Sequence, residues 1–135
     1  MEQITVEATL ENLQTVIDFA TEQLEVRACP MKTSMQLELV IEEIFVNISN
    51  YAYHPEIGSA TFRMEFESNP DAVLMTFIDS GKPYNPLEKD DPDTTLDIDE
   101  RDIGGLGIFL VKKNVDEITY EYEDGKNILR MKKFF

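Results

Sequence analysis

Glu43 and Asn47 are the residues of this 135-residue chain whose spacing first suggests chemistry. They stand four positions apart within the stretch 35–53, so in a helix their side chains share one face. An amide oxygen can bind a hard cation while a carboxylate one turn away faces a water or hydroxyl. Mg²⁺ takes few protein ligands and completes its shell with phosphate oxygens, so Asn47 alone could serve. Two ordinary residues of a helix surface would show the same spacing.

A second candidate is Asp79, which ends an apolar run and is followed by Ser80 and Gly81. A carboxylate at a strand end can accept a hydrogen bond from an exocyclic amine. Gly81 has no side chain, so a flat ring could approach the backbone there. Asp-Ser-Gly is also a common turn sequence, and that interpretation stays open.

The third candidate is the run Gly104-Gly105-Leu106-Gly107, which opens an apolar stretch of helical character. Glycines at a helix start expose backbone N–H groups to an anion, with the positive end of the helix dipole behind them. Such a site needs no basic side chain, which suits an acidic protein. The glycines could instead only shape a tight turn.

The stretch 35–53 must position the first of these candidates. Its apolar residues recur at three- and four-residue steps and predict an amphipathic helix lying on a core. They are Leu37, Val40, Ile41, Ile44, Phe45, Ile48 and Ala52. A polar row runs beside this stripe through Glu43, Asn47, Asn50 and His54, and Leu39 and Val46 flank it. We therefore expect the polar row to open into a cavity.

The remaining elements follow from periodicity and turn residues. We predict strands at 4–8, 60–66, 72–78, 118–122 and 127–134, and helices at 11–26 and 104–114. Asn12 or Thr9 could cap the first helix, and Asp124-Gly125 is a strong hairpin turn. The segment from Tyr84 to Ile103 reads as a long mobile loop. The order predicts an α/β (α+β) two-layer sandwich with helices on one face of a mixed, mostly antiparallel sheet.

Composition narrows the class of protein. The length fits one domain, 1–135, and the formal net charge of −15 disfavours nucleic acid and anionic membranes as partners. It favours a basic protein surface instead, and eight acidic residues gather between Glu88 and Asp102. No apolar run reaches the ~20 residues of a membrane span, so we expect a soluble, cytoplasmic protein. Cys29 is the only cysteine and His54 the only histidine, which leaves no internal disulfide and little support for a multi-histidine metal site.

Taken together, the three motifs resemble a known family in their order and spacing. Glu-x-x-x-Asn on a helix, Asp-x-Gly at a strand end, a long lid and Gly-x-Gly on a helix are similar to the N, G1 and G2 boxes. These belong to the ATPase superfamily of DNA gyrase and histidine kinases (GHKL), which has the histidine-kinase-like (Bergerat) fold. The length and the ending from Asp116 to Met131 look most like the anti-sigma-factor serine/threonine kinases of the RsbW and SpoIIAB type.

The resemblance implies a role for each matching residue. Glu43 would be the general base and Asn47 the Mg²⁺ ligand. Asp79 would accept from the adenine amine with Gly81 beneath the ring, and the 86–103 segment would be the ATP lid. The remaining contacts to the ATP phosphates would come from Gly105, Leu106, Gly107 and Arg101. One departure is Tyr51, which stands where the family often has a histidine.

The resemblance also implies partners: a sigma factor and a STAS-type anti-sigma-factor antagonist that accepts the phosphoryl group, together with a homodimer. It implies no direct contact with nucleic acid or a membrane. Two alternatives remain open at this stage. One is a catalytically weak, nucleotide-responsive binding module, and the other is the detached catalytic domain of a sensor histidine kinase.

Overall fold

The computed structural model describes residues 1–88 and 103–135, with the side chains of 103–106 excluded. The predicted order of strands and helices is confirmed. The helices are α1 (Leu13–Val26), α2 (Met31–Asn47) and α3 (Ile103–Asn114), with short turns η1 (Leu10–Asn12), η2 (Ile48–Ala52) and η3 (Pro86–Glu88). The strands are β1 (Glu2–Glu7), β2 (Ser59–Glu67), β3 (Ala72–Asp79), β4 (Glu117–Glu123) and β5 (Lys126–Phe134). None of the described helices is long and apolar enough to cross a membrane.

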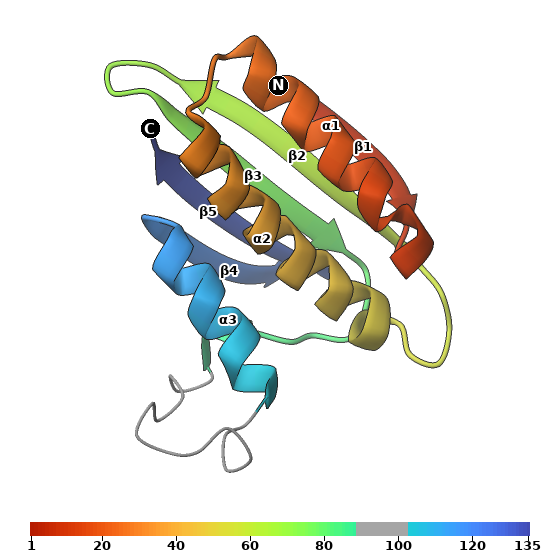
Figure 1. The fold of residues 1–135 in the computed structure, drawn as a ribbon. Helices are drawn as coiled ribbons and strands as arrows, with labels where there is room; N and C mark the ends of the chain where they lie inside the picture. The colour runs from red at the N-terminus through yellow and green to blue at the C-terminus, as the bar shows by residue number, and fades with distance from the viewer. Residues whose placement is uncertain (89–102) are drawn as a thin grey trace.

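The five strands form one sheet in the order β1-β2-β3-β5-β4, and the helices lie over one of its faces (Figure 1). The predicted two-layer fold is therefore confirmed. Each of the four pairings is antiparallel, so the described part of the sheet contains no parallel pair where the sequence suggested a mixed one. The strand with the most apolar sequence, β3, lies at the centre. Asp124 and Gly125 have φ values of 52° and 76°, as a tight two-residue hairpin turn requires.

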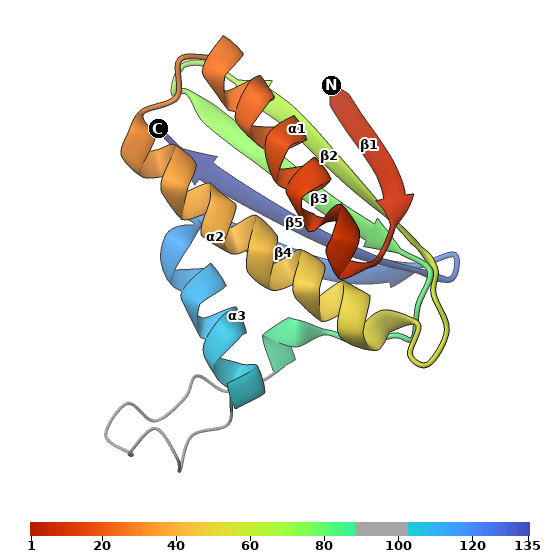
Figure 2. The same ribbon diagram turned by 45° about the vertical axis from the view of Figure 1, so that its right-hand side comes forward.

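Helix α2 lies between α1 and α3 and crosses the centre of the sheet (Figure 2). Its predicted apolar stripe is buried, with Leu37, Val40 and Ile41 fully inaccessible. Phe45 on the same stripe is 1% exposed, and Phe77 of β3 is buried in the same core. Removing a buried phenylalanine ring typically costs about 3–5 kcal/mol. This packing fixes the height and rotation of α2, and therefore the direction in which Glu43 and Asn47 project.

The end of α2 departs from the prediction of one regular helix to Tyr53. The α-helix ends at Asn47 and continues as the π-helical turn η2. In a π turn the hydrogen bond joins residues that are five positions apart. The residues four and five positions after Asn47 therefore lie on the same side of the helix as Asn47. Tyr51 and Ala52 therefore line the cavity described below, whereas Asn50 and His54 of the predicted polar row are exposed.

The first helix also begins differently from the prediction. A 3₁₀ turn at Leu10–Asn12 precedes α1, and neither Thr9 nor Asn12 caps a helix with its side chain. Asn12 Nδ2 instead donates to the Glu7 carbonyl at 2.9 Å. The capping prediction was wrong because this amide ties the end of β1 to the start of the helix.

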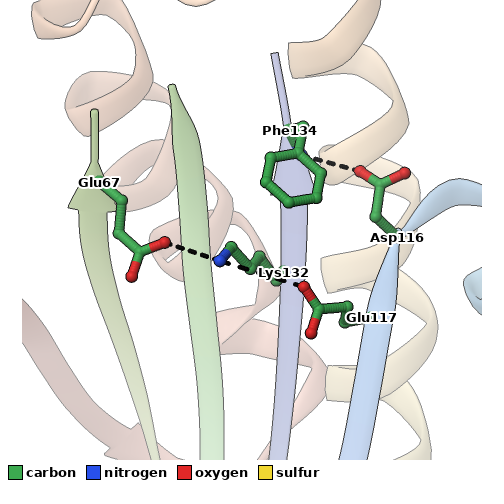
Figure 3. Close-up of polar contacts among 5 residues, drawn as sticks. All are labelled: Glu67, Asp116, Glu117, Lys132 and Phe134. Carbon is green, nitrogen blue, oxygen red and sulfur yellow. Dashed lines mark hydrogen bonds and ion pairs between the residues drawn. The ribbon is translucent and has the colours of Figure 1, made fainter. Parts of the chain in front are cut away.

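The face of the sheet turned away from the helices carries long charged side chains (Figure 3). Lys132 Nζ lies 2.8 Å from Glu67 Oε1 and 4.0 Å from Glu117 Oε2, bridging three strands. The Phe134 N–H donates to Asp116 Oδ2 at 2.8 Å. Lys132 thus connects its own strand β5 with β2 and β4, but ion pairs of this kind near the surface add little stability.

Candidate nucleotide site

A cavity of about 590 Å³ lies between the end of α2, the end of β3, the start of β5 and the segment after β3. This volume is ordinary for a site that takes a small organic ligand. Its walls are largely apolar with a few polar groups. The lining residues are Ile44, Asn47, Ile48, Tyr51, Ala52, Phe77, Asp79, Lys82, Pro83, Tyr84, Pro86, Ile108, Tyr120, Asn127 and Leu129.

Asp79 is the buried acid of this cavity, 7% exposed at the end of β3. Its Oδ1 accepts hydrogen bonds from the Gly81 N–H at 2.9 Å and from Asn127 Nδ2 at 3.0 Å. Burial raises the pKa of Asp79 above its ordinary value, and these two hydrogen bonds offset part of that rise. Among the described residues no buried side-chain oxygen or nitrogen lacks a partner. Oδ2, which takes neither bond, therefore keeps contact with the cavity.

Asn127, the second residue of β5, is a buried polar residue of the cavity that the sequence analysis missed. It is 7% exposed, pairs with Asp79 across the β3–β5 ladder and lines the same cavity. The sequence did carry a signal, because Asn127 shares the core face of its strand with Leu129 and Met131. A polar residue on such a face normally has specific hydrogen-bond partners.

Gly81 has a packing role that the sequence analysis did not predict. It is not among the residues that line the cavity, and a Cβ there would lie 2.3 Å from the Ala52 carbonyl oxygen. The next residue, Lys82, donates its N–H to that same oxygen at 2.9 Å. The glycine thus lets the turn after β3 pack directly on the end of η2. This contact sets the position of Asp79 relative to Asn47.

Tyr53 closes the same corner from the other side. The Ser80 N–H donates to its hydroxyl oxygen at 2.7 Å, and the hydroxyl donates to the Ser59 carbonyl. One side chain therefore joins the end of α2 and η2 to the start of β2 and the end of β3. The floor of the cavity is held by this contact and by the Gly81 packing.

Asn47 lines the cavity on the α2 side, and Glu43 lies one turn before it. Both side chains are half-buried, and neither takes a hydrogen bond or ion pair from the described residues. Glu43 reaches α3: a Cβ on Gly107 would lie 2.6 Å from Glu43 Oε2. The missing side chain of Gly107 therefore gives this carboxylate its room.

The glycine run opens α3, as predicted. Gly105 lies in the first turn, where N–H groups have no acceptor within the helix. Gly107 is the fifth residue of α3, so regular helix geometry directs its N–H to the carbonyl of residue 103. A phosphate contact by the Gly107 N–H would need the helix to begin later. The Leu106 backbone lies in the first turn, whereas Arg101 and most of the predicted lid lie outside the described residues.

The polar groups around the cavity fit Mg²⁺ with a phosphate ligand better than a metal held by protein alone. Within 1–88 and 103–135 no three of His, Cys, Asp and Glu cluster as a metal site. Asn47 offers one uncommitted amide oxygen to the cavity. Mg²⁺ commonly takes a single protein oxygen or two and fills its shell with water and phosphate oxygens. Asn47 would hold the ion from the α2 side.

Comparison with known families agrees with this arrangement. Residues 6–133 match the histidine kinase-like ATPase domain. The chain therefore belongs to that family, and membership implies ATP binding and an ATPase or kinase type of activity. The comparison with curated proteins gave no match. The superfamily resemblance noted in the sequence is confirmed, while the resemblance to anti-sigma-factor kinases stays a prediction.

Proposed function

We propose that this protein is an ATP-dependent protein serine/threonine kinase that also binds a sigma factor. The observation that supports it best is that Asp79 and Asn47 line one cavity, whose wall also includes Ile108 of α3. The aromatic and apolar walls suit a base. Asn47 and the N–H groups of the first turn of α3 are the contacts that we propose for the phosphates. The finer assignment rests on the resemblance of the ending 116–131 and on the acidity of the chain.

In the proposed reaction, ATP would supply the γ-phosphoryl group, and Mg²⁺ held by Asn47 would neutralise phosphate charge. Asp79 accepts from the exocyclic amine of adenine. Glu43 takes the proton from a partner's serine hydroxyl as the new O–P bond forms and the bond to the ADP oxygen breaks. Phosphoryl transfer depends mainly on positioning and charge stabilisation, which this arrangement of side chains supplies.

Calorimetric titration with ATP and ADP, with and without Mg²⁺, tests the nucleotide site. We expect binding in the wild type and its loss in Asp79→Asn, because an amide cannot offer the same charged acceptor. Asn47→Ala should remove the dependence of binding on Mg²⁺, whereas the exposed Asn50→Ala should keep it. No binding to the wild type would overturn the proposal. An Asn47→Ala protein that still needs Mg²⁺ would refute the ligand role.

Transfer of the labelled γ-phosphate to a partner separates a kinase from a nucleotide-responsive binding module. A STAS-type antagonist with an accepting serine is the partner to offer, and phosphoserine survives acid whereas phosphohistidine does not. An acid-labile product would favour the histidine-kinase alternative. ATP binding without transfer to any serine-bearing partner would favour the binding module.

Charge gives a test of the sigma-factor partner. With 27 acidic and 12 basic residues, the chain should attract a basic DNA-binding protein over long range. Association should therefore slow steeply as salt rises, while dissociation changes less. An association rate independent of salt would count against the electrostatic part of the proposal.

The unpaired outer edge of β1, at the end of the sheet, is our candidate for the homodimer contact.

A further inference from the structure

Asn127 uses both ends of its side chain at the base end of the cavity. Its Nδ2 donates to Asp79 Oδ1 at 3.0 Å and to the Lys82 carbonyl at 2.8 Å. Its Oδ1 accepts from the Tyr84 N–H at 3.1 Å and from the Tyr120 hydroxyl. These partners also fix the amide's orientation, since the oxygen faces two donors and the nitrogen faces two acceptors.

The partners come from three separate parts of the chain. Asp79 is the end of β3, Tyr120 is on β4, and Lys82 and Tyr84 belong to the segment that leads toward η3. Asn127 itself is the second residue of β5, which lies between β3 and β4. One buried amide therefore connects the acid of the cavity with the segment that forms its wall.

The bonds to Asp79 are distributed unequally between its two oxygens. Oδ1 receives Asn127 Nδ2 and the Gly81 N–H, and no described residue donates to Oδ2 of this cavity-lining side chain. A carboxylate held in this way offers one acceptor in one direction. A group that donates, such as an amine on a purine ring, matches it, whereas a carbonyl at the same place would face it oxygen to oxygen.

We propose that Asn127 is a positioning residue that holds Asp79 in the orientation selective for a 6-amino purine, and ties the Lys82–Tyr84 segment to it. This inference rests on the proposed nucleotide site. Asn127 acts through Asp79 and need not touch the base. Its predicted effect is therefore on discrimination between ligands, beyond any effect on folding.

The test compares ATP with inosine triphosphate, which has a carbonyl in place of the amine, by calorimetry in the presence of Mg²⁺. The wild type should prefer ATP by about 10- to 100-fold, the usual worth of a hydrogen bond to a charged group. Asn127→Ala and the isosteric Asn127→Asp should lower that ratio by about tenfold or abolish it. Asn127→Asp keeps both acceptor contacts but turns both donor contacts into repulsion between oxygens, so it reverses the contact with Asp79 that Asn127→Ala only removes.

Met131→Ala is the matched control, because Met131 is a buried residue of the same strand and lies outside the cavity. It should lower the thermal midpoint and keep the preference for ATP. If the Asn127 variants also lower the midpoint but keep the wild-type ratio, Asn127 is merely structural and the inference fails. If the wild type binds neither triphosphate, the proposed nucleotide site fails instead.

A measurement on the wild type covers the case in which the Asn127 variants do not fold. In an NMR titration, the side-chain amide resonances of Asn127 should shift with ATP but not with inorganic tripolyphosphate, which lacks a base. Equal shifts with both ligands, or none with ATP, would overturn the inference.

Discussion

Two regions around the cavity differ in how their polar side chains are held. Near the end of β3, Asp79 and Asn127 are buried and bonded to each other. On the α2 side, Glu43 and Asn47 are half-buried and have no protein partner among the described residues. The first pair is assembled before any ligand binds. The second pair keeps its polar atoms available for a ligand, an ion or a reacting group. In the proposed function, the residues that recognise the base are therefore held in place in advance, and those that take part in the reaction stay free to bind, on separate sides of one site.

The largest effect on the rate of phosphoryl transfer should come from the α2 side, where the polar side chains have no protein partner among the described residues. Glu43→Ala removes the proposed base, and general-base help is typically worth about 10²–10⁴-fold, so phosphoryl transfer should fall by about that factor. ATP affinity should stay near the wild-type value, because Glu43 does not line the cavity. Initial rates and calorimetry on the same preparation measure both quantities.

Glu42→Ala is the matched control for this prediction. Glu42 is the neighbouring carboxylate, is exposed and points to another side of the helix. It should leave the rate unchanged. A Glu43→Ala protein with the wild-type rate would show that another group takes the proton.

The two glycines that touch these ends should respond differently to substitution. In Gly81→Ala the new Cβ meets the backbone of Ala52 at 2.3 Å, so main chain must move, which typically costs about 1–3 kcal/mol. In Gly107→Ala the nearest atom is the carboxylate oxygen of Glu43, which can rotate away. Alanine also favours a helix interior by about 1 kcal/mol over glycine.

Thermal unfolding and transfer rate together test this contrast. Gly81→Ala should lower the thermal midpoint and weaken ATP binding. Gly107→Ala should keep or raise the midpoint and yet slow transfer, because it displaces Glu43. Equal destabilisation by both substitutions would contradict the distinction between a rigid and an adaptable end.

The smallest expected effect concerns the stability of the ligand-free protein. Because the pKa of Asp79 is raised on folding, the unfolded chain releases this proton at lower pH than the folded chain does. Ionised Asp79 therefore reduces stability, from about its ordinary pKa of 3.8 upward, until pH passes the raised value. Asp79→Asn should be more stable than the wild type above that window and gain nothing below it.

Chemical denaturation at a series of pH values measures this difference, and the exposed Asp71→Asn is the control. An Asp79→Asn protein whose advantage grows as pH falls would have the opposite sign and would refute the argument. The same variant should lose ATP binding. A gain in stability with a loss of binding would mark Asp79 as a residue kept for its ligand.

The sequence could predict what depends on neighbours in the chain. Periodicity predicted α2 with its buried Leu37 and Phe45, and the turn residues predicted the hairpin at Asp124-Gly125. The sequence also predicted that Glu43 and Asn47 lie on one face of a helix, and they do lie one turn apart on α2.

What could not be predicted depends on contacts between distant segments. The core-face position of Asn127 could mark it as a polar residue with partners, but its meeting with Asp79 depends on the register in which β5 pairs with β3. The purpose of Gly81 depends on the Ala52 carbonyl, and the π turn after Asn47 has no signature in the period of the apolar residues. The roles assigned to individual site residues stay predictions until the substitutions above are measured.

The cavity also determines how binding can be observed. The chain has no tryptophan and five tyrosines, so tyrosine dominates its near-ultraviolet emission. Three of the five, Tyr51, Tyr84 and Tyr120, line the cavity. A purine seated among them will change their emission by contact quenching. The native protein therefore carries its own optical reporter, with most of its fluorophores at the site where a ligand would arrive.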